Sequence, residues 1–111
     1  MAAIANLTID QGATFSSDVT VKDAQDNAFN LTGYTAVAKL SKGFASTRTR
    51  TNMTTSIATD ATTGVVTLSL TATETSALDA ERYVYDLEIT SGATVTRVIE
   101  GIITVRAQVT V

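Results

Sequence analysis

Hydrophobic and polar residues alternate along most of the chain, which is the pattern of β-strands that bury one face. The alternation is clearest over residues 82–90, where Tyr83, Tyr85, Leu87 and Ile89 share one face. The same pattern predicts further strands at 4–10, 14–22, 34–40, 53–58, 65–70 and 93–105. Gly101, inside the last of these strands, predicts a β-bulge.

Segments rich in turn-forming residues separate the predicted strands. Asp23–Asn30 and Thr59–Gly64 contain clustered Asp, Asn, Thr or Gly residues, and Ser91-Gly92 has the composition of a hairpin turn. Residues 41–52 are polar and, apart from Phe44, lack periodicity, so we predict a loop there, or ragged edge strands around a loop.

One short helix is expected among the strands. Thr71 and Glu74 have the spacing of a capping box, which predicts a helical turn near 71–78. About seven short strands with turn signals every 8–12 residues are typical of an immunoglobulin-like antiparallel β-sandwich, and a β-barrel is the alternative. We therefore expect a single all-β domain that covers residues 1–111.

A tyrosine near the start of the clearest strand supports the sandwich. Asp79 and Tyr83 are four residues apart, as at the corner of immunoglobulin-like sandwiches, where a tyrosine hydroxyl bonds to the backbone upstream. We assign both residues a structural role in such a corner. The alternative is that Tyr83 is an ordinary packed aromatic residue.

The alternation also predicts the core. Its members are Leu7, Ile9, Phe15, Val19, Val21, Ala36, Ala38, Leu40, Val66, Leu68, Leu70, Leu78, Tyr83, Tyr85, Leu87, Ile89, Val98 and Ile102.

Composition favours strands and excludes several chemistries. Thr, Val and Ile contribute 22, 11 and 7 of the 111 residues, and such β-branched side chains suit a pleated sheet. Cysteine and histidine are both absent. The chain therefore has no disulfide, no thiolate or imidazole metal ligand, and no histidine base for catalysis.

The net charge of −3 bears on the kind of partner. No basic stripe is present to contact nucleic acid, and an acidic surface repels anionic membranes. No apolar run approaches the ~20 residues of a membrane-spanning helix. The first residues lack the features of a signal peptide, so we expect synthesis in a host cytoplasm.

An ordered set of short motifs carries a family resemblance. The motifs are Asn6–Gly12, Leu31–Tyr34, Asp60–Leu68, Leu70–Thr75, Tyr83–Leu87 and Arg97–Val105. Together, over residues 6–111, they resemble the immunoglobulin-like N-terminal domain of phage baseplate upper proteins. The chain is also similar to small virion structural proteins of tailed phages.

The resemblance implies a non-enzymatic module of the virion. Such a domain docks on other virion structural proteins, in multiple symmetric copies, and has no catalytic residues, cofactor or small-molecule substrate. The sequence lacks the C-terminal stalk and receptor-binding attachment region of baseplate upper proteins, so the adaptor role does not carry over automatically. A tail or baseplate position and a capsid decoration role both stay open.

The predicted loop contains the candidate interface. Lys42, Phe44, Arg48 and Arg50 place three cations and an aromatic residue in one aperiodic stretch of an acidic chain. Arg and Phe are effective anchors in protein interfaces, so we predict that residues 42–50 contact a partner. The alternative is a solvated loop without a partner.

Other polar groups have simpler interpretations. Asp86 and Glu88 lie on the predicted solvent face of a strand, where glycoside hydrolysis is the remote alternative. Asp23, Asp26 and Asn27 do not have calcium-loop spacing and are expected to stabilise a turn, so no metal site is predicted. A carbohydrate-binding module is the alternative function, because sandwiches bind sugars through exposed aromatic side chains.

Overall fold

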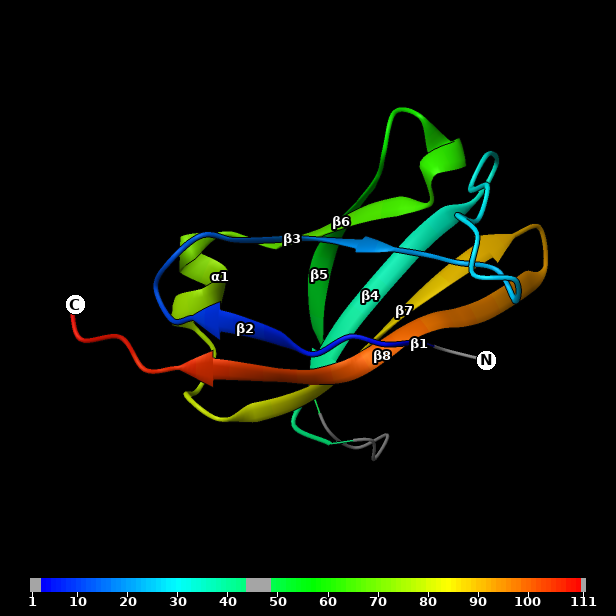
Figure 1. Cartoon of the computed structure of the whole chain (residues 1–111). Helices are drawn as coiled ribbons and strands as arrows, with labels where there is room; N and C mark the ends of the chain where they lie inside the picture. The colour runs from blue at the N-terminus through cyan, green and yellow to red at the C-terminus, as the bar shows by residue number, and fades with distance from the viewer. Residues whose placement is uncertain (1–2, 44–48, 111) are drawn as a thin grey trace.

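The computed structural model describes residues 3–43 and 49–110. The described part of the chain is mainly β, with eight strands and one short α-helix (Figure 1). The strands are β1 (Ala3–Ile4), β2 (Leu7–Asp10), β3 (Phe15–Thr20), β4 (Thr35–Ser41), β5 (Thr51–Ile57), β6 (Val65–Leu70), β7 (Arg82–Ser91) and β8 (Thr94–Arg106). The α-helix α1 covers Ala72–Ser76, and a 3-10 turn covers Ala61–Thr63.

All strands belong to a single curled sheet. Its order is β1-β8-β7-β4-β5-β6-β3, and β2 also pairs with β8. β1 and β2 run parallel to β8, whereas the remaining neighbours are antiparallel. The sheet is therefore mixed and forms a half-barrel, rather than the two separate antiparallel sheets that the sequence led us to expect.

β5 is the reason that the sheet does not divide in two. Its first residues, Thr51–Met53, pair with β4, and its remaining residues, Thr54–Ile57, pair with β6. The strand thus changes partner near its middle and joins the two groups of strands. The predicted strand at 53–58 begins two residues later than β5, and residues 51 and 52, which make this connection, fall in the stretch predicted as a loop or ragged edge strands.

Elements that depend on nearby residues lie where the sequence predicts them. β6 has the predicted limits. Thr71 caps α1 through its hydroxyl, which accepts from the Glu74 amide at 3.2 Å, and Glu74 Oε1 accepts from the Thr71 amide at 2.8 Å. Gly64 ends the turn before β6 with a left-handed φ of 71°.

The faces of β8 differ from the prediction because its bulge lies elsewhere. Leu87 pairs with Ile99 and Glu88 with Arg97, so Val98 is the additional residue and Gly101 pairs regularly with Tyr85. The predicted core residue Ile102 consequently faces outward and is 42% exposed. Its neighbour Ile103 is buried instead.

The rest of the predicted core is largely confirmed. Leu7, Ala36 and Val98 are half-buried, and all the other predicted members except Ile102 are buried. The prediction missed the buried side chains of Leu31, Met53, Thr75, Ile99, Ile103 and Val105.

Gly101 allows the N-terminal segment to approach the sheet. A Cβ at this position would lie 2.2 Å from the Ala5 carbonyl oxygen, so no side chain fits. The Tyr85 hydroxyl donates to the same carbonyl at 2.5 Å, and the Ile102 amide donates to Asn6 Oδ1 at 3.0 Å. These bonds satisfy the Ala5 carbonyl and the Ile102 amide where the pairing with β8 is interrupted between β1 and β2.

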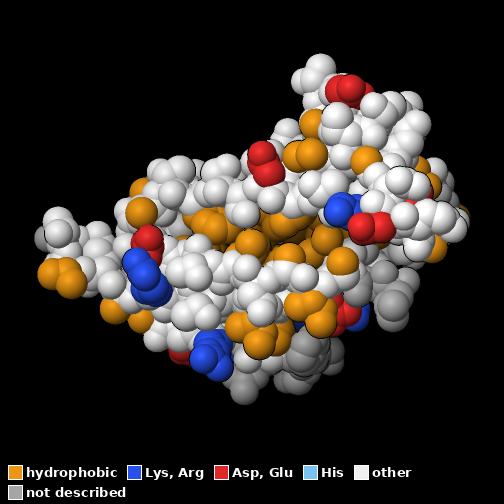
Figure 2. Space-filling model, in the orientation of Figure 1, with side chains coloured by type: hydrophobic (Ala, Val, Ile, Leu, Met, Phe, Trp, Pro, Cys, Tyr) orange, Lys and Arg blue, Asp and Glu red, His pale blue; other side chains and the backbone are white. Residues whose placement is uncertain are grey.

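The curl places β3 and the β1–β2 segment on opposite sides of the open half-barrel (Figure 1). Figure 2 shows hydrophobic side chains in the middle of this face of the molecule. At its β2–β3 end, residues including Leu7 and Phe15 line a groove of ≈ 330 Å³. The interior of the half-barrel is therefore the hydrophobic core, and this view looks onto its open side.

The register of β8 gives a test by paired substitution. We expect Ile103→Ala to lower the free energy of unfolding by about 2–5 kcal/mol, because it leaves a cavity among buried side chains. Ile102→Ala should change it by less than about 0.5 kcal/mol, as for other surface positions. Urea denaturation of both variants measures the difference, and equal losses would contradict the register.

Because the Tyr85 hydroxyl is buried, we expect the protein to lose stability at alkaline pH. Burial raises the pKa of this hydroxyl to about 12. A raised pKa means that the unfolded chain releases this proton first, so stability is complete below about pH 10 and falls as the pH rises through 12. The difference between the two pKa values corresponds to a loss of roughly 2–3 kcal/mol in the free energy of unfolding.

The matched variant for this test is Tyr85→Phe, which lacks the titrating group. It should be less stable than the parent by about 1 kcal/mol at neutral pH because the bond to Ala5 is lost. The gap between the two proteins should narrow or reverse on titration from pH 9 to 12, as measured by urea denaturation at each pH. A constant gap would refute the assignment.

Candidate interaction site

The corner predicted at Asp79 and Tyr83 is present. The Tyr83 hydroxyl accepts from the Asp79 amide at 2.9 Å and donates to the Asp79 carbonyl at 3.1 Å. The Tyr83 ring is buried, because β7 points it into the core. One hydroxyl therefore satisfies both backbone groups of Asp79 and fixes the chain that enters β7.

Helix α1 and the turn after β2 hold the other side of this corner. Gln11 Nε2 donates to the Leu78 carbonyl at 2.8 Å, and Gln11 Oε1 accepts from the Gln108 amide at 3.1 Å. The fully buried Thr75 hydroxyl accepts from the Gly12 amide and donates to the Ala13 carbonyl. Helix α1 and the segment that follows it are therefore hydrogen-bonded to the turn after β2. Through Gln11 they are also linked to the C-terminal segment at Gln108.

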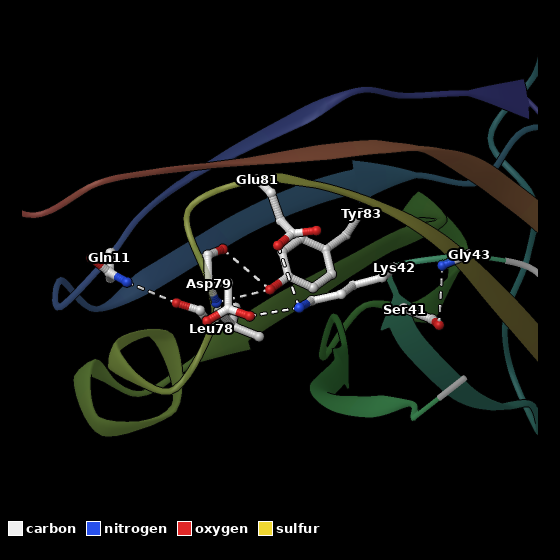
Figure 3. Close-up of polar contacts among 8 residues, drawn as sticks. All are labelled: Gln11, Ser41, Lys42, Gly43, Leu78, Asp79, Glu81 and Tyr83. Atoms are coloured by element: carbon white, nitrogen blue, oxygen red, sulfur yellow. Dashed lines mark hydrogen bonds and ion pairs between the residues drawn. The ribbon is translucent and has the colours of Figure 1, made fainter. Parts of the chain in front are cut away.

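The fixed corner presents two carboxylates to Lys42. Lys42 Nζ lies 2.5 Å from Asp79 Oδ2 and 3.3 Å from Glu81 Oε2. Figure 3 shows the Lys42 side chain reaching along the Tyr83 ring to the corner, with the acidic groups on either side. The hydrogen bonds donated to Asp79 and Glu81 raise the pKa of the Lys42 ammonium above its ordinary value.

The start and end of the predicted contact loop lie beside each other. Lys42 follows β4 directly, and Arg50 precedes β5. Arg50 Nη1 donates to Ser41 Oγ at 3.3 Å, and the Gly43 amide is 3.4 Å from the same oxygen. The loop therefore starts and ends on a defined base formed by β4, β5 and the corner.

The structure brings together only part of the predicted interface. Lys42 is engaged by Asp79 and Glu81, and Arg50 by Ser41. Phe44 and Arg48 lie outside the described residues. Glu81 was not among the predicted site residues, and no local signal identifies it, because its pairing with Lys42 depends on the fold.

The tyrosine at the centre of the site has a perturbed hydroxyl. Burial raises the pKa of Tyr83, and this effect outweighs the opposing influence of its bond to the Asp79 backbone and the nearby Lys42 charge. Tyr83 is therefore the neutral, hydrogen-bonded anchor of the corner at physiological pH.

The other acidic candidates have partners within the chain. Asp86 forms an ion pair with Arg97 at 3.2 Å on the solvent side of the sheet. Asp23 Oδ1 accepts from the Gln25 and Asn27 amides, each at 2.9 Å, as expected for a turn. Among the described residues, no three acidic side chains gather in a way that could hold a metal ion.

Comparison with known proteins adds no relative. No family model matches the sequence, and no curated protein is similar enough to count as a relative. Within the described part of the chain, neither helical segment has the length and apolar character needed to cross a membrane.

The corner generates a prediction for Tyr83→Phe. Loss of the hydroxyl should lower the free energy of unfolding by about 1 kcal/mol, the usual net value of a hydrogen bond. The control is Tyr34→Phe, since the structure gives the Tyr34 hydroxyl no hydrogen bond among the described residues. Thermal and urea denaturation compare the two variants, and equal stabilities would reduce Tyr83 to a packed aromatic residue.

Proposed function

We propose that this protein is a non-enzymatic structural module of a phage virion, which docks on another virion protein through residues 42–50. The proposal combines the family resemblance of the sequence with the placement of the loop on the fold. The single observation that carries the docking role is the base of this loop, which is fixed to the corner by Lys42, Asp79 and Glu81.

The connectivity supports an immunoglobulin-like origin of the half-barrel. One group of strands has the order β3-β6-β5, and the other has the order β2-β8-β7-β4. The corner tyrosine lies at the start of β7, as in immunoglobulin-like domains. In this interpretation, the change of partner along β5 joins what would otherwise be two sheets.

The fixed base favours a contact role for the loop. Binding residues commonly lie on loops held by a rigid scaffold, and a loop with anchored ends loses less conformational entropy on binding. Lys42 and Arg50 are committed to contacts within the chain. Phe44 and Arg48 are therefore the residues that we assign to the partner, an aromatic anchor and a cation suited to an acidic surface.

The resemblance favours a tail or baseplate position over the capsid surface. In either place the module would be present in several symmetric copies. Carbohydrate binding is the weaker alternative, because Phe15, Tyr83 and Tyr85 are buried. The outer face of β4, β7 and β8 also carries no aromatic residue in the described strands.

The decisive experiment separates docking from folding. We expect the double variant Phe44→Ala/Arg48→Glu to be incorporated into particles several-fold less than the parent while it keeps the same melting temperature. Binding that depends on Arg48 should also weaken at high salt, because the Debye screening length falls to ~3 Å at 1 M. Quantitative immunoblots of purified particles, and of separated tails and capsids, measure incorporation and location.

Two further variants complete this test. Lys22→Glu/Val109→Ala alters one cation and one apolar residue elsewhere on the surface and should be incorporated normally. Arg48→Glu alone retains Phe44, so it still tests the contact if Phe44 proves necessary for folding. Normal incorporation of both loop variants would sink the proposal.

A further inference from the structure

Strand β3 forms one edge of the sheet, because it pairs with β6 alone (Figure 1). Its six residues, Phe15–Thr20, pair in an unbroken antiparallel register. Proteins usually protect such an edge with proline, lysine, a β-bulge or a very short strand. β3 has none of these features, whereas β1 and β2, at the other edge, have only two and four residues. β3 is therefore the unprotected edge of the described sheet.

The hydrogen bonds beside β3 show which of its backbone groups are unpaired. The Val21 amide donates to the Gly64 carbonyl at 2.8 Å, so the odd-numbered residues along this strand face β6. The backbone amides and carbonyls of Ser16, Asp18 and Thr20 consequently point away from β6. No group in the described part of the chain bonds to them. Such a row of donors and acceptors recognises the backbone of another extended segment.

A groove beside this edge suits the side chains of such a segment. It is the groove of ≈ 330 Å³ between β2 and β3, and its lining includes the apolar side chains of Leu7, Ala13 and Phe15. Successive side chains of a strand point to opposite faces. A segment paired with β3 therefore directs every second side chain toward the groove, which favours apolar residues at those positions and polar residues between them.

Asp18 determines which charge the polar positions prefer. It is the one charged residue of β3, and its exposed carboxylate accepts from the Thr67 hydroxyl at 2.6 Å. It has no ion pair among the described residues, and Lys22, the nearest cation along the chain, is paired with Asp26 at 3.6 Å. A lysine or arginine opposite Asp18 is therefore attracted.

The same carboxylate disfavours a second copy of this chain as the occupant. In the two antiparallel registers of β3 with β3 that overlap most, the two Asp18 carboxylates are direct or diagonal neighbours across the strand pair. Like charges in such positions repel each other. An unlike segment that carries a cation has no such penalty.

From these observations we infer that β3 binds an extended segment of another protein, which adds a strand to the sheet. The segment pairs antiparallel with Ser16, Asp18 and Thr20, since this is the more stable of the two pairing directions. It places alternate apolar side chains toward the groove and a lysine or arginine opposite Asp18. The inference does not rest on docking through residues 42–50, because it assigns a different surface.

The test uses the capped peptide Val-Thr-Val-Lys-Val-Thr-Val as the probe and isothermal titration calorimetry as the measurement. The parent should bind this peptide roughly fivefold more tightly than the same peptide with glutamate in place of lysine. Asp18→Lys should reverse the preference. N-methylation of the lysine and of both threonines blocks the amides that face β3 and should abolish binding.

The matched control is Glu100→Lys, which makes the same charge change on β8, four strands away from β6 and outside the groove. It should keep the preference of the parent, as should Phe44→Ala/Arg48→Glu, so failure of loop docking and failure of strand addition are distinguishable. Binding of the N-methylated peptide, or a preference that is the same in Asp18→Lys as in the parent, would overturn the inference. The comparison of peptides on the parent alone decides the question if Asp18→Lys does not fold.

Sedimentation equilibrium of the parent without peptide tests the alternative occupant. We expect a monomer. Ser16→Pro removes one amide at the free edge and leaves the bonds to β6 in place. A parent dimer that Ser16→Pro dissociates would assign the edge to a second copy and overturn the inference.

Discussion

The double hydrogen bond between the Tyr83 hydroxyl and the Asp79 backbone is the interaction on which the site depends. The ring is buried in the core, so the hydroxyl has a fixed position, and the backbone of Asp79 is fixed with it. The side chains of Asp79 and Glu81 then lie where Lys42 can reach both. A buried aromatic residue thereby determines, through one backbone segment and one ion pair, where the loop at 42–50 begins.

The same scaffold supports two surfaces with different chemistry. The loop begins beside the corner, at the end of β4, whereas β3 forms a free edge of the sheet. The loop offers side chains for contact, whereas β3 offers unpaired backbone groups.

Features that depend on nearby residues could be predicted from the sequence. The capping box of Thr71 and Glu74, the limits of β6 and the corner of Tyr83 each involve groups within a few positions of one another. The bulge at Val98, the change of partner along β5 and the engagement of Lys42 depend on strands that meet only in the folded chain. The bulge predicted at Gly101 is wrong, because a glycine within a strand marks either a bulge or the close approach of another segment, and alternation cannot distinguish the two.

The seating of Ala5 and Asn6 against β8 has a consequence for how the chain folds. Asn6 and Ile102 are bonded although 96 positions separate them, nearly the full length of the polypeptide. Closing such a long loop is entropically costly, so we expect this pairing to form after the local β7–β8 hairpin. During synthesis, the first strands leave the ribosome well before their partner exists. The N-terminal segment therefore has no native neighbour until β8 has been synthesised.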